Sequence, residues 1–236
     1  MVCPAGNSYA IITKEQTLLL EAGLQLAKVR KEVDLSKVVG CVVTHKHKDH
    51  AAYVGSYYMR FPLAAPKSVV SFSKSNAVCL EDKQPHKIGQ FVVYPIGVPH
   101  QDADGAPCQC FAYLIMHPSF GSLLFVTDTY NLPVIVPKVN HFLIEANYTQ
   151  DMLDKDLLTG GITKIQRERI IISHMSIDNC IEIINQCGTS ITKTITLCHL
   201  SQRHSQPSVF KSLVEMHTGI PTYIALPGAT IPLVKV

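Results

Sequence analysis

Long apolar runs, a leader-like N-terminus and a strong net charge are all lacking in this 236-residue sequence. No apolar run approaches the roughly 18 to 20 residues that cross a bilayer, and the first residues are not a basic stretch followed by an apolar core. We therefore expect a cytoplasmic protein with no membrane contact. The formal net charge of only +3 excludes a nucleic-acid packaging protein but is compatible with a phosphate-bearing substrate.

Charged residues are also scarce, at 17% of the chain against 47% apolar residues. This balance does not suggest disorder, and it suffices for a single domain over residues 1–236 with a sizeable core. Most of the eight cysteines lie in apolar strand-like or helical segments, where a free thiol behaves as a small hydrophobic side chain. Cys108 and Cys110 form one Cys-x-Cys pair without a second pair, so no zinc site is predicted there.

The most informative stretch is the sequence Thr-His-Lys-His-Lys-Asp-His at residues 44–50. The apolar residues 41–43 predict the end of a buried strand, and residues 51–59 predict the start of a helix, so the polar run lies on the turn between them. A solvated turn is the alternative, but it has no use for three histidines. We interpret four of these residues as metal ligands: His45, His47, Asp49 and His50.

The spacing of these ligands predicts two ions. His45 and His47 are two residues apart, which in an extended chain turns both imidazoles to the same side. Asp49 and His50 then turn into the helix start and reach a second ion. Imidazole nitrogen and carboxylate oxygen bind zinc, manganese and iron, so the run predicts a hydrolytic centre with two divalent ions, zinc or manganese.

Residues 44–50 resemble the Thr-His-x-His-x-Asp-His signature of the metallo-beta-lactamase superfamily and match it at every specified position. The resemblance implies an α/β fold, the four-layer αββα sandwich of that superfamily. Two features depart from the usual pattern. The first strand, before the loop at residues 6–8, is short or missing, and Glu21 stands where an aspartate usually supports the metal loop. The resemblance implies that supporting role for Glu21, and a solvated glutamate at a strand end is the alternative.

The resemblance implies three further ligands, each directly after a segment with strand patterning. His100 is the third histidine of the first ion, with a solvated loop histidine as the alternative. Asp128 bridges the ions, because a carboxylate can bind one ion with each oxygen; an Asx turn is its alternative. His199 completes the second ion. The first ion is thereby assigned His45, His47 and His100, and the second Asp49, His50 and His199. Asp102 and Asp104 are predicted to be turn carboxylates.

Two His-x-Ser sequences, at residues 174–176 and 199–201, compete for the last ligand position. By their order, His199 matches the terminal metal ligand and His174 the proton donor of ribonuclease Z-like members, and swapped roles are the alternative. The catalytic residues are then His174 as general acid and Asp49, which orients the attacking water. Glu145 lies in a segment that resembles the WalJ/YycJ-type exonuclease-like branch and, more distantly, ribonuclease Z, which implies a place at the edge of the active site.

The secondary structure follows from periodicity. Alternating or continuously apolar patterns predict strands at residues 7–12, 17–20, 38–43, 67–72, 91–96, 111–116, 121–126, 141–148 and 194–198. Helical patterns cover residues 24–33, 51–59 and 177–186, and either Ser173 or Ser176 is positioned to cap the last of these helices.

The resemblance implies a binuclear metal-dependent phosphodiesterase whose substrate is a nucleic acid or nucleotide. A histidine that acts as general acid and an aspartate that bridges two ions favour a phosphodiester as the substrate over a thiolester or a lactam. A nuclease acting on DNA or RNA is the first hypothesis, with Lys46, Lys48 and Arg203 available to the phosphate backbone. A cyclic mononucleotide phosphodiesterase of the phage anti-defence type is the alternative.

Two further functions are disfavoured. Ribonuclease Z carries a long arm between its third histidine and its bridging aspartate, whereas His100 and Asp128 are separated by 28 positions (128 minus 100), which leaves no room for that arm. A non-catalytic binding module usually loses ligands, and all seven are present here. Similar proteins commonly dimerise, so a homodimer is compatible with the resemblance.

Overall fold

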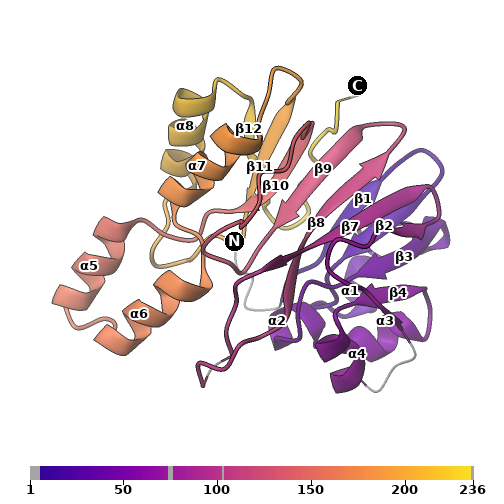
Figure 1. Cartoon of the computed structure of the whole chain (residues 1–236), viewed down its shortest axis with the longest axis horizontal. Coiled ribbons are helices and arrows are strands. Elements are labelled where there is room, and N and C mark those ends of the chain that lie inside the picture. The colour runs from indigo at the N-terminus through magenta and orange to yellow at the C-terminus, as the bar shows by residue number, and fades with distance from the viewer. Residues whose placement is uncertain (1–5, 74–76, 103, 235–236) are drawn as a thin grey trace.

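The computed structural model describes residues 6–73, 77–102 and 104–234. Within these residues two sheets lie against each other (Figure 1). The first sheet has the strand order β1-β2-β3-β4-β5, and the second has the order β12-β11-β10-β9-β8-β7-β6. No helix in the described part of the chain is both long and apolar enough to cross a membrane.

The strands of the first sheet are β1 (Tyr9–Ile12), β2 (Thr17–Leu20), β3 (Val38–Val42), β4 (Leu63–Ala65) and β5 (Val78–Cys79). Those of the second are β6 (His86–Ile88), β7 (Phe91–Val98), β8 (Cys110–His117), β9 (Gly121–Val126), β10 (His141–Glu145), β11 (Thr194–Cys198) and β12 (Thr222–Ile224). The helices in the first half of the chain are α1 (Leu26–Val29), η1 (Leu35–Lys37), α2 (Lys48–Ala51), α3 (Val54–Tyr58) and α4 (Lys67–Ser73). Those in the second half are α5 (Gln150–Leu158), α6 (Lys164–Ser173), α7 (Ile177–Cys187) and α8 (Pro207–Thr218).

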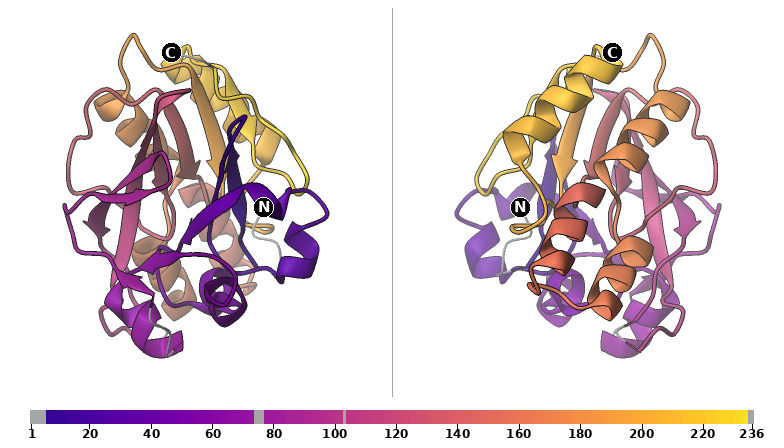
Figure 2. Two further views of the ribbon diagram at one scale, coloured as in Figure 1. Left: turned by 90° about the vertical axis from the view of Figure 1, so that its right-hand side faces the viewer. Right: turned by 90° about the vertical axis from the view of Figure 1, so that its left-hand side faces the viewer.

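Strand direction decides where the functional loops lie. β2, β3, β4 and β5 pair in parallel in the first sheet, and β9, β10, β11 and β12 do so in the second. Parallel strands all end at the same edge of a sheet, so the loops that follow β9, β10 and β11 are neighbours. In Figure 2 the helices α5 and α6 lie at the same end of the molecule as the helices of the N-terminal half.

Alternating side chains sort the core into separate layers. Leu18 and Leu20 of β2 pack between the two sheets, whereas Leu19 points to the opposite face and packs with α3. In the second sheet Leu143 of β10 faces the first sheet, and Phe142 on the other face joins the cluster that includes α7. Burying each such side chain stabilises the folded state by roughly 1.5–3 kcal/mol relative to leaving it exposed. With helices on both outer faces, as Figure 1 shows, these clusters give the predicted four-layer αββα order.

One predicted strand is wrong. Residues 67–72 form the helix α4 rather than a strand. The Pro66 carbonyl accepts hydrogen bonds from the N–H groups of Val69 and Val70, which starts a helical turn, and the buried side chain of Val69 packs into the cluster under the first sheet. A short apolar run fits either period, and here tertiary packing decides for the helix.

Several predicted boundaries also move. The strand predicted to reach residue 148 ends at Glu145, and the helix predicted over 24–33 is reduced to α1. Residues 51–59 are divided between α2 and α3. Ser176 caps α7 by accepting the Asn179 N–H, whereas Ser173 belongs to α6. The short or missing strand before the loop at residues 6–8 falls on residues outside the described part.

Candidate metal centre

The structure brings all seven predicted ligands to one edge of the sandwich. His45, His47, Asp49 and His50 follow β3, His100 follows β7, Asp128 follows β9, and His199 follows β11. The ligand atoms form two clusters, and within each cluster all of them lie within 4.8 Å of one another. The His45 and His50 ring centroids are 4.3 Å apart, so the two clusters are adjacent.

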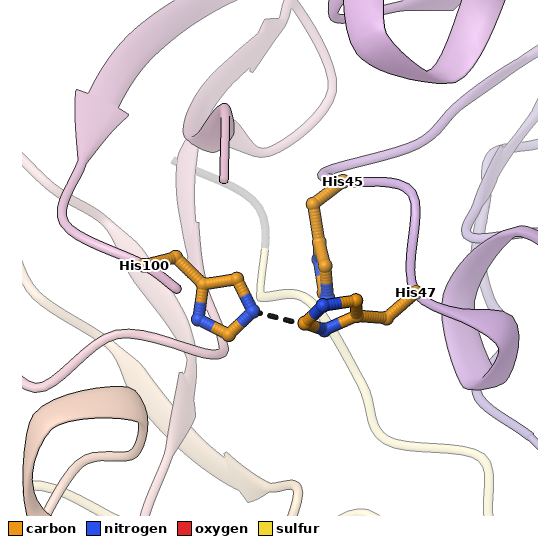
Figure 3. A group of neighbouring side chains, drawn as sticks. All are labelled: His45, His47 and His100. Carbon is orange, nitrogen blue, oxygen red and sulfur yellow. Dashed lines mark hydrogen bonds between the residues drawn. The ribbon is translucent and has the colours of Figure 1, made fainter. Parts of the chain in front are cut away.

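The first cluster consists of three imidazoles, His45, His47 and His100 (Figure 3). His100 Nε2 lies 3.0 Å from His47 Nδ1, and the buried His45 Nε2 has no hydrogen-bond partner among the described residues. Burial lowers the pKa of His45 well below its usual value and that of His100 to about 4. For these two histidines burial favours the unprotonated imidazole, which is the form whose nitrogen can bind a divalent cation.

The second cluster combines two carboxylates with two imidazoles. His50 Nε2 lies 3.0 Å from Asp128 Oδ2 and 3.1 Å from Asp49 Oδ2, and His199 Nε2 lies 3.3 Å from Asp128 Oδ2. Burial alone would raise the pKa of Asp128, but His199 and His50 hold it well below the usual range. Burial disfavours charge on His199 as well, yet Asp128 and Glu145 raise its pKa to about 10. A divalent cation would replace the protons that now balance these carboxylates.

Backbone strain is concentrated at this edge. Five non-glycine residues in the described part of the chain have positive φ, and three belong to the site: Glu21 (67°), Asp128 (52°) and His199 (51°). Each lies within two residues of the end of its strand. A left-handed backbone costs a non-glycine residue on the order of 1–3 kcal/mol and persists only where the surrounding structure holds it. At these three residues the conformational cost goes with a sharp turn after the strand, and this turn directs the side chain toward the site.

Glu21 is fully buried, which excludes a solvated glutamate. Its Oε2 accepts the Thr44 N–H at 3.2 Å, and its Oε1 lies 3.4 Å from His50 Nδ1. The side chain therefore contacts both the backbone of residues 44–50 and a ring nitrogen of the candidate ligand His50, despite being one methylene longer than aspartate. A carboxylate beside Nδ1 is compatible with the ring orientation in which Nε2 of His50 faces the cluster.

Glu145 lies between the two histidines whose roles the sequence left open. It is fully buried, and its Oε1 lies 2.9 Å from His199 Nδ1 and 2.8 Å from His174 Nδ1. Burial would raise the pKa of Glu145, but the two imidazoles lower it. His199 Nε2 faces the carboxylates of the second cluster, whereas the partly exposed His174 reaches Asp128 only at 3.7 Å.

Two residues that contact the candidate ligands were not predicted from the sequence. Asn7 is buried, and its Nδ2 lies within hydrogen-bonding distance of Asp49 and His50. Asn147, also buried, donates to the backbone carbonyl of His199 at 2.8 Å. Asn7 lies in the loop at residues 6–8 and Asn147 lies two residues after Glu145, but no periodicity in the sequence distinguishes an amide that contacts a candidate ligand from a solvated one.

Asp102 forms the predicted turn, and its side chain also contacts a histidine of the first cluster. Its backbone carbonyl accepts the Gly105 N–H, as a turn requires. Its carboxylate, however, lies 3.1 Å from His47 Nε2 and accepts from Lys46 Nζ at 2.7 Å. This contact fixes the His47 ring with Nδ1 toward the first cluster, in the way that carboxylates orient metal-binding histidines.

We expect Asp102→Ala to weaken cation binding at the first cluster by about 10–100-fold, because His47 loses the partner that orients its ring. Calorimetric titration of the metal-free protein with Mn²⁺ or Zn²⁺ measures this. The matched control is Asp104→Ala in the same loop, since exposed Asp104 accepts the Ala106 N–H and has no other side-chain hydrogen bond to the described residues. An equal loss in both variants would contradict the prediction and indicate damage to the loop.

Two of the three basic residues predicted to contact a phosphate backbone already have partners. Lys46 pairs with Asp102, and Arg203 pairs with Asp156 at 2.9 Å. Lys48 is exposed and makes no hydrogen bond or ion pair through its side chain with the described residues. Lys48 is therefore the one of the three whose ammonium group is available to a phosphate.

Known proteins resemble this chain in sequence and in fold, although no protein-family model matches it. Exodeoxyribonuclease WalJ of Streptococcus pneumoniae is 26% identical over 226 residues, covering 85% of this chain and 80% of WalJ. Exodeoxyribonuclease YycJ of Bacillus anthracis is 24% identical over 217 residues, covering 83% and 78%. The structure of YhfI from Bacillus subtilis, a metallo-beta-lactamase fold protein, superposes with a TM-score of 0.71 over 94% of this chain and 88% of YhfI, at 17% identity. The chain therefore has the metallo-beta-lactamase fold and is similar in sequence to the exodeoxyribonucleases WalJ and YycJ.

Proposed function

We propose that this protein is a metal-dependent phosphodiesterase that cleaves DNA with two divalent cations, zinc or manganese. The observation that carries the proposal is the adjacency of an imidazole cluster and a carboxylate–imidazole cluster at one edge of the sandwich. We assign His45, His47 and His100 to the first ion, Asp49, His50 and His199 to the second, and Asp128 to both.

Two cations in such a site supply Lewis acidity, which lowers the pKa of a water and neutralises charge on the phosphodiester. The side chains orient the attacking water and supply the proton for the leaving oxygen. Asp49 is partly exposed, so its carboxylate is open to a water and would accept a hydrogen bond from the attacking one. His174 holds Nδ1 against Glu145, which leaves Nε2 free to protonate the leaving oxygen. Glu145 thereby stabilises the doubly protonated imidazolium, whose Nε2 proton is the one donated to the leaving oxygen.

The position of His174 supports its assignment as acid rather than ligand. Its Nδ1 is occupied by Glu145, and its ring stacks on that of His199 with centroids 5.4 Å apart. His199 points its free Nε2 into the carboxylate cluster. Glu145 contacts Nδ1 of both histidines, so the two differ in their approach to Asp128. His199 faces that carboxylate with Nε2 at 3.3 Å, whereas His174 approaches it only with Nδ1 at 3.7 Å, and these contacts favour His199 as the ligand.

DNA is favoured as the substrate by the names of the two relatives, both exodeoxyribonucleases that match more than four fifths of this chain. A cyclic mononucleotide is not favoured. The test is cleavage of labelled single-stranded and duplex DNA, RNA and a panel of cyclic mononucleotides, each with Mn²⁺ and with Zn²⁺. Cleavage of DNA from an end supports the proposal, and activity confined to cyclic nucleotides or no phosphodiesterase activity at all contradicts it.

A further inference from the structure

Three segments that are distant in sequence meet beneath the second cluster. The Asn7 N–H donates to the Asp49 carbonyl at 2.6 Å, the Gly23 N–H donates to the Asn7 carbonyl at 3.0 Å, and the Ala22 N–H donates to the His50 carbonyl at 2.7 Å. These bonds join the loop before β1, the loop after β2 and the start of α2. Asn7 is at the centre of this arrangement.

The approach of these backbones requires glycine at two positions. Gly6 has φ of 104°, and a Cβ there would overlap the Gly23 carbonyl. A Cβ on Gly23 would in turn overlap the Asp49 carbonyl and crowd the Asn7 nitrogen. With no side chain in the way, the backbone of Asn7 is held directly against that of Asp49, and the Asn7 side chain has little freedom to turn elsewhere.

The Asn7 amide is directed at the ligands themselves. It is 3% exposed, and its Nδ2 donates to Asp49 Oδ2 at 3.2 Å and lies 3.0 Å from His50 Nε2. Asp49 Oδ2 and His50 Nε2 are themselves 3.1 Å apart, so the amide nitrogen faces the pair of atoms assigned to the second cation. Asp49 is otherwise only partly enclosed, with 40% of its side chain exposed.

We propose that Asn7 is a positioning residue for Asp49. The backbone N–H of Asn7 donates to the Asp49 carbonyl, and its side-chain amide donates to the Asp49 carboxylate. The inference rests on the proposed function, in which Asp49 binds the second cation and orients the attacking water. The amide bond occupies one lone pair of Oδ2 and holds the carboxylate plane, so that the remaining lone pairs stay directed at the cation and the water.

The test compares Asn7→Ala and Asn7→Asp with wild type and with Asn140→Ala. Asn140 is a matched control, because it is equally buried but binds Ser122 and the Ile191 carbonyl at the opposite end of β10. Each protein is titrated calorimetrically with Mn²⁺ in metal-free form. Then kcat and KM are measured with bis-p-nitrophenyl phosphate, and melting temperatures are recorded.

We expect both Asn7 variants to bind the second Mn²⁺ about 10–100-fold more weakly and to lose kcat with little change in KM. Asn7→Asp does not restore binding, because it has no N–H to donate and opposes a second carboxylate. Asn140→Ala lowers the melting temperature and leaves Mn²⁺ affinity and kcat unchanged.

Two results would overturn the inference. Asn7→Asp binding Mn²⁺ as tightly as wild type would show that an oxygen at this position faces the cation, and Asn7→Ala matching Asn140→Ala in affinity and kcat would show a structural role alone. Failure of the proposed function gives a different pattern. Wild type would then bind two cations and cleave no phosphodiester, and the inference would be decided by the titration.

Discussion

Asp128→Asn is expected to reduce DNA cleavage at least a thousandfold, equivalent to about 4 kcal/mol of transition-state stabilisation. The carboxylate is assigned to both ions, and it opposes His50 and His199 at 3.0 and 3.3 Å, so its replacement removes the charge that holds the second cation. Asparagine is the appropriate substitution because φ at this position is 52°, a conformation that asparagine tolerates better than alanine.

The measurement pairs a cleavage assay with the metal content of the purified variant. We expect less than two equivalents of cation to remain bound. The control is Asp34→Asn, in which an exposed carboxylate that caps η1 by accepting the Ser36 N–H is neutralised far from the cluster. A variant of Asp128 that retained both ions and more than a tenth of wild-type activity would refute the bridging assignment.

His174→Ala is expected to slow DNA cleavage by about 10²–10⁴-fold, the usual contribution of a general acid. The same variant is expected to cleave bis-p-nitrophenyl phosphate within tenfold of the wild-type rate, since p-nitrophenolate leaves without needing a proton. Its content of bound cation is expected to be unchanged. The comparison of the two substrates therefore separates proton donation from metal binding.

His199→Ala provides the contrast for this experiment. Because His199 is assigned as a ligand, the variant is expected to lose the second cation. It is then expected to cleave both DNA and bis-p-nitrophenyl phosphate slowly. If instead His174→Ala lost the cation and His199→Ala showed the dependence on leaving group, the two roles would be exchanged. Both variants remove one imidazole from the same carboxylate, Glu145, so an effect transmitted through that residue is common to the two.

Local sequence determined the parts of the protein that depend on neighbouring residues. The spacing of the four candidate ligands in residues 44–50 predicted two groups, and in the structure His45 and His47 lie in one cluster and Asp49 and His50 in the other. Strand patterning was sufficient where both faces are buried, as in residues 194–198. The sequence also narrowed the cap of the helix at 177–186 to Ser173 or Ser176, of which the structure selects Ser176. In each of these cases the interaction spans only a few residues.

Only the tertiary structure decided the remaining features, because they depend on which loops lie side by side. Residues 67–72 fit a strand and a helix equally well by pattern, and the packing of Val69 made them a helix. Asn7 meets Asp49 across 42 residues, and Asp102 meets His47 across 55. The parallel register of β10 and β11 brings Glu145 beside the loop that carries His199. Spacing in a sequence carries no information about such contacts, since they follow from the pairing of distant strands and the burial of the groups between them.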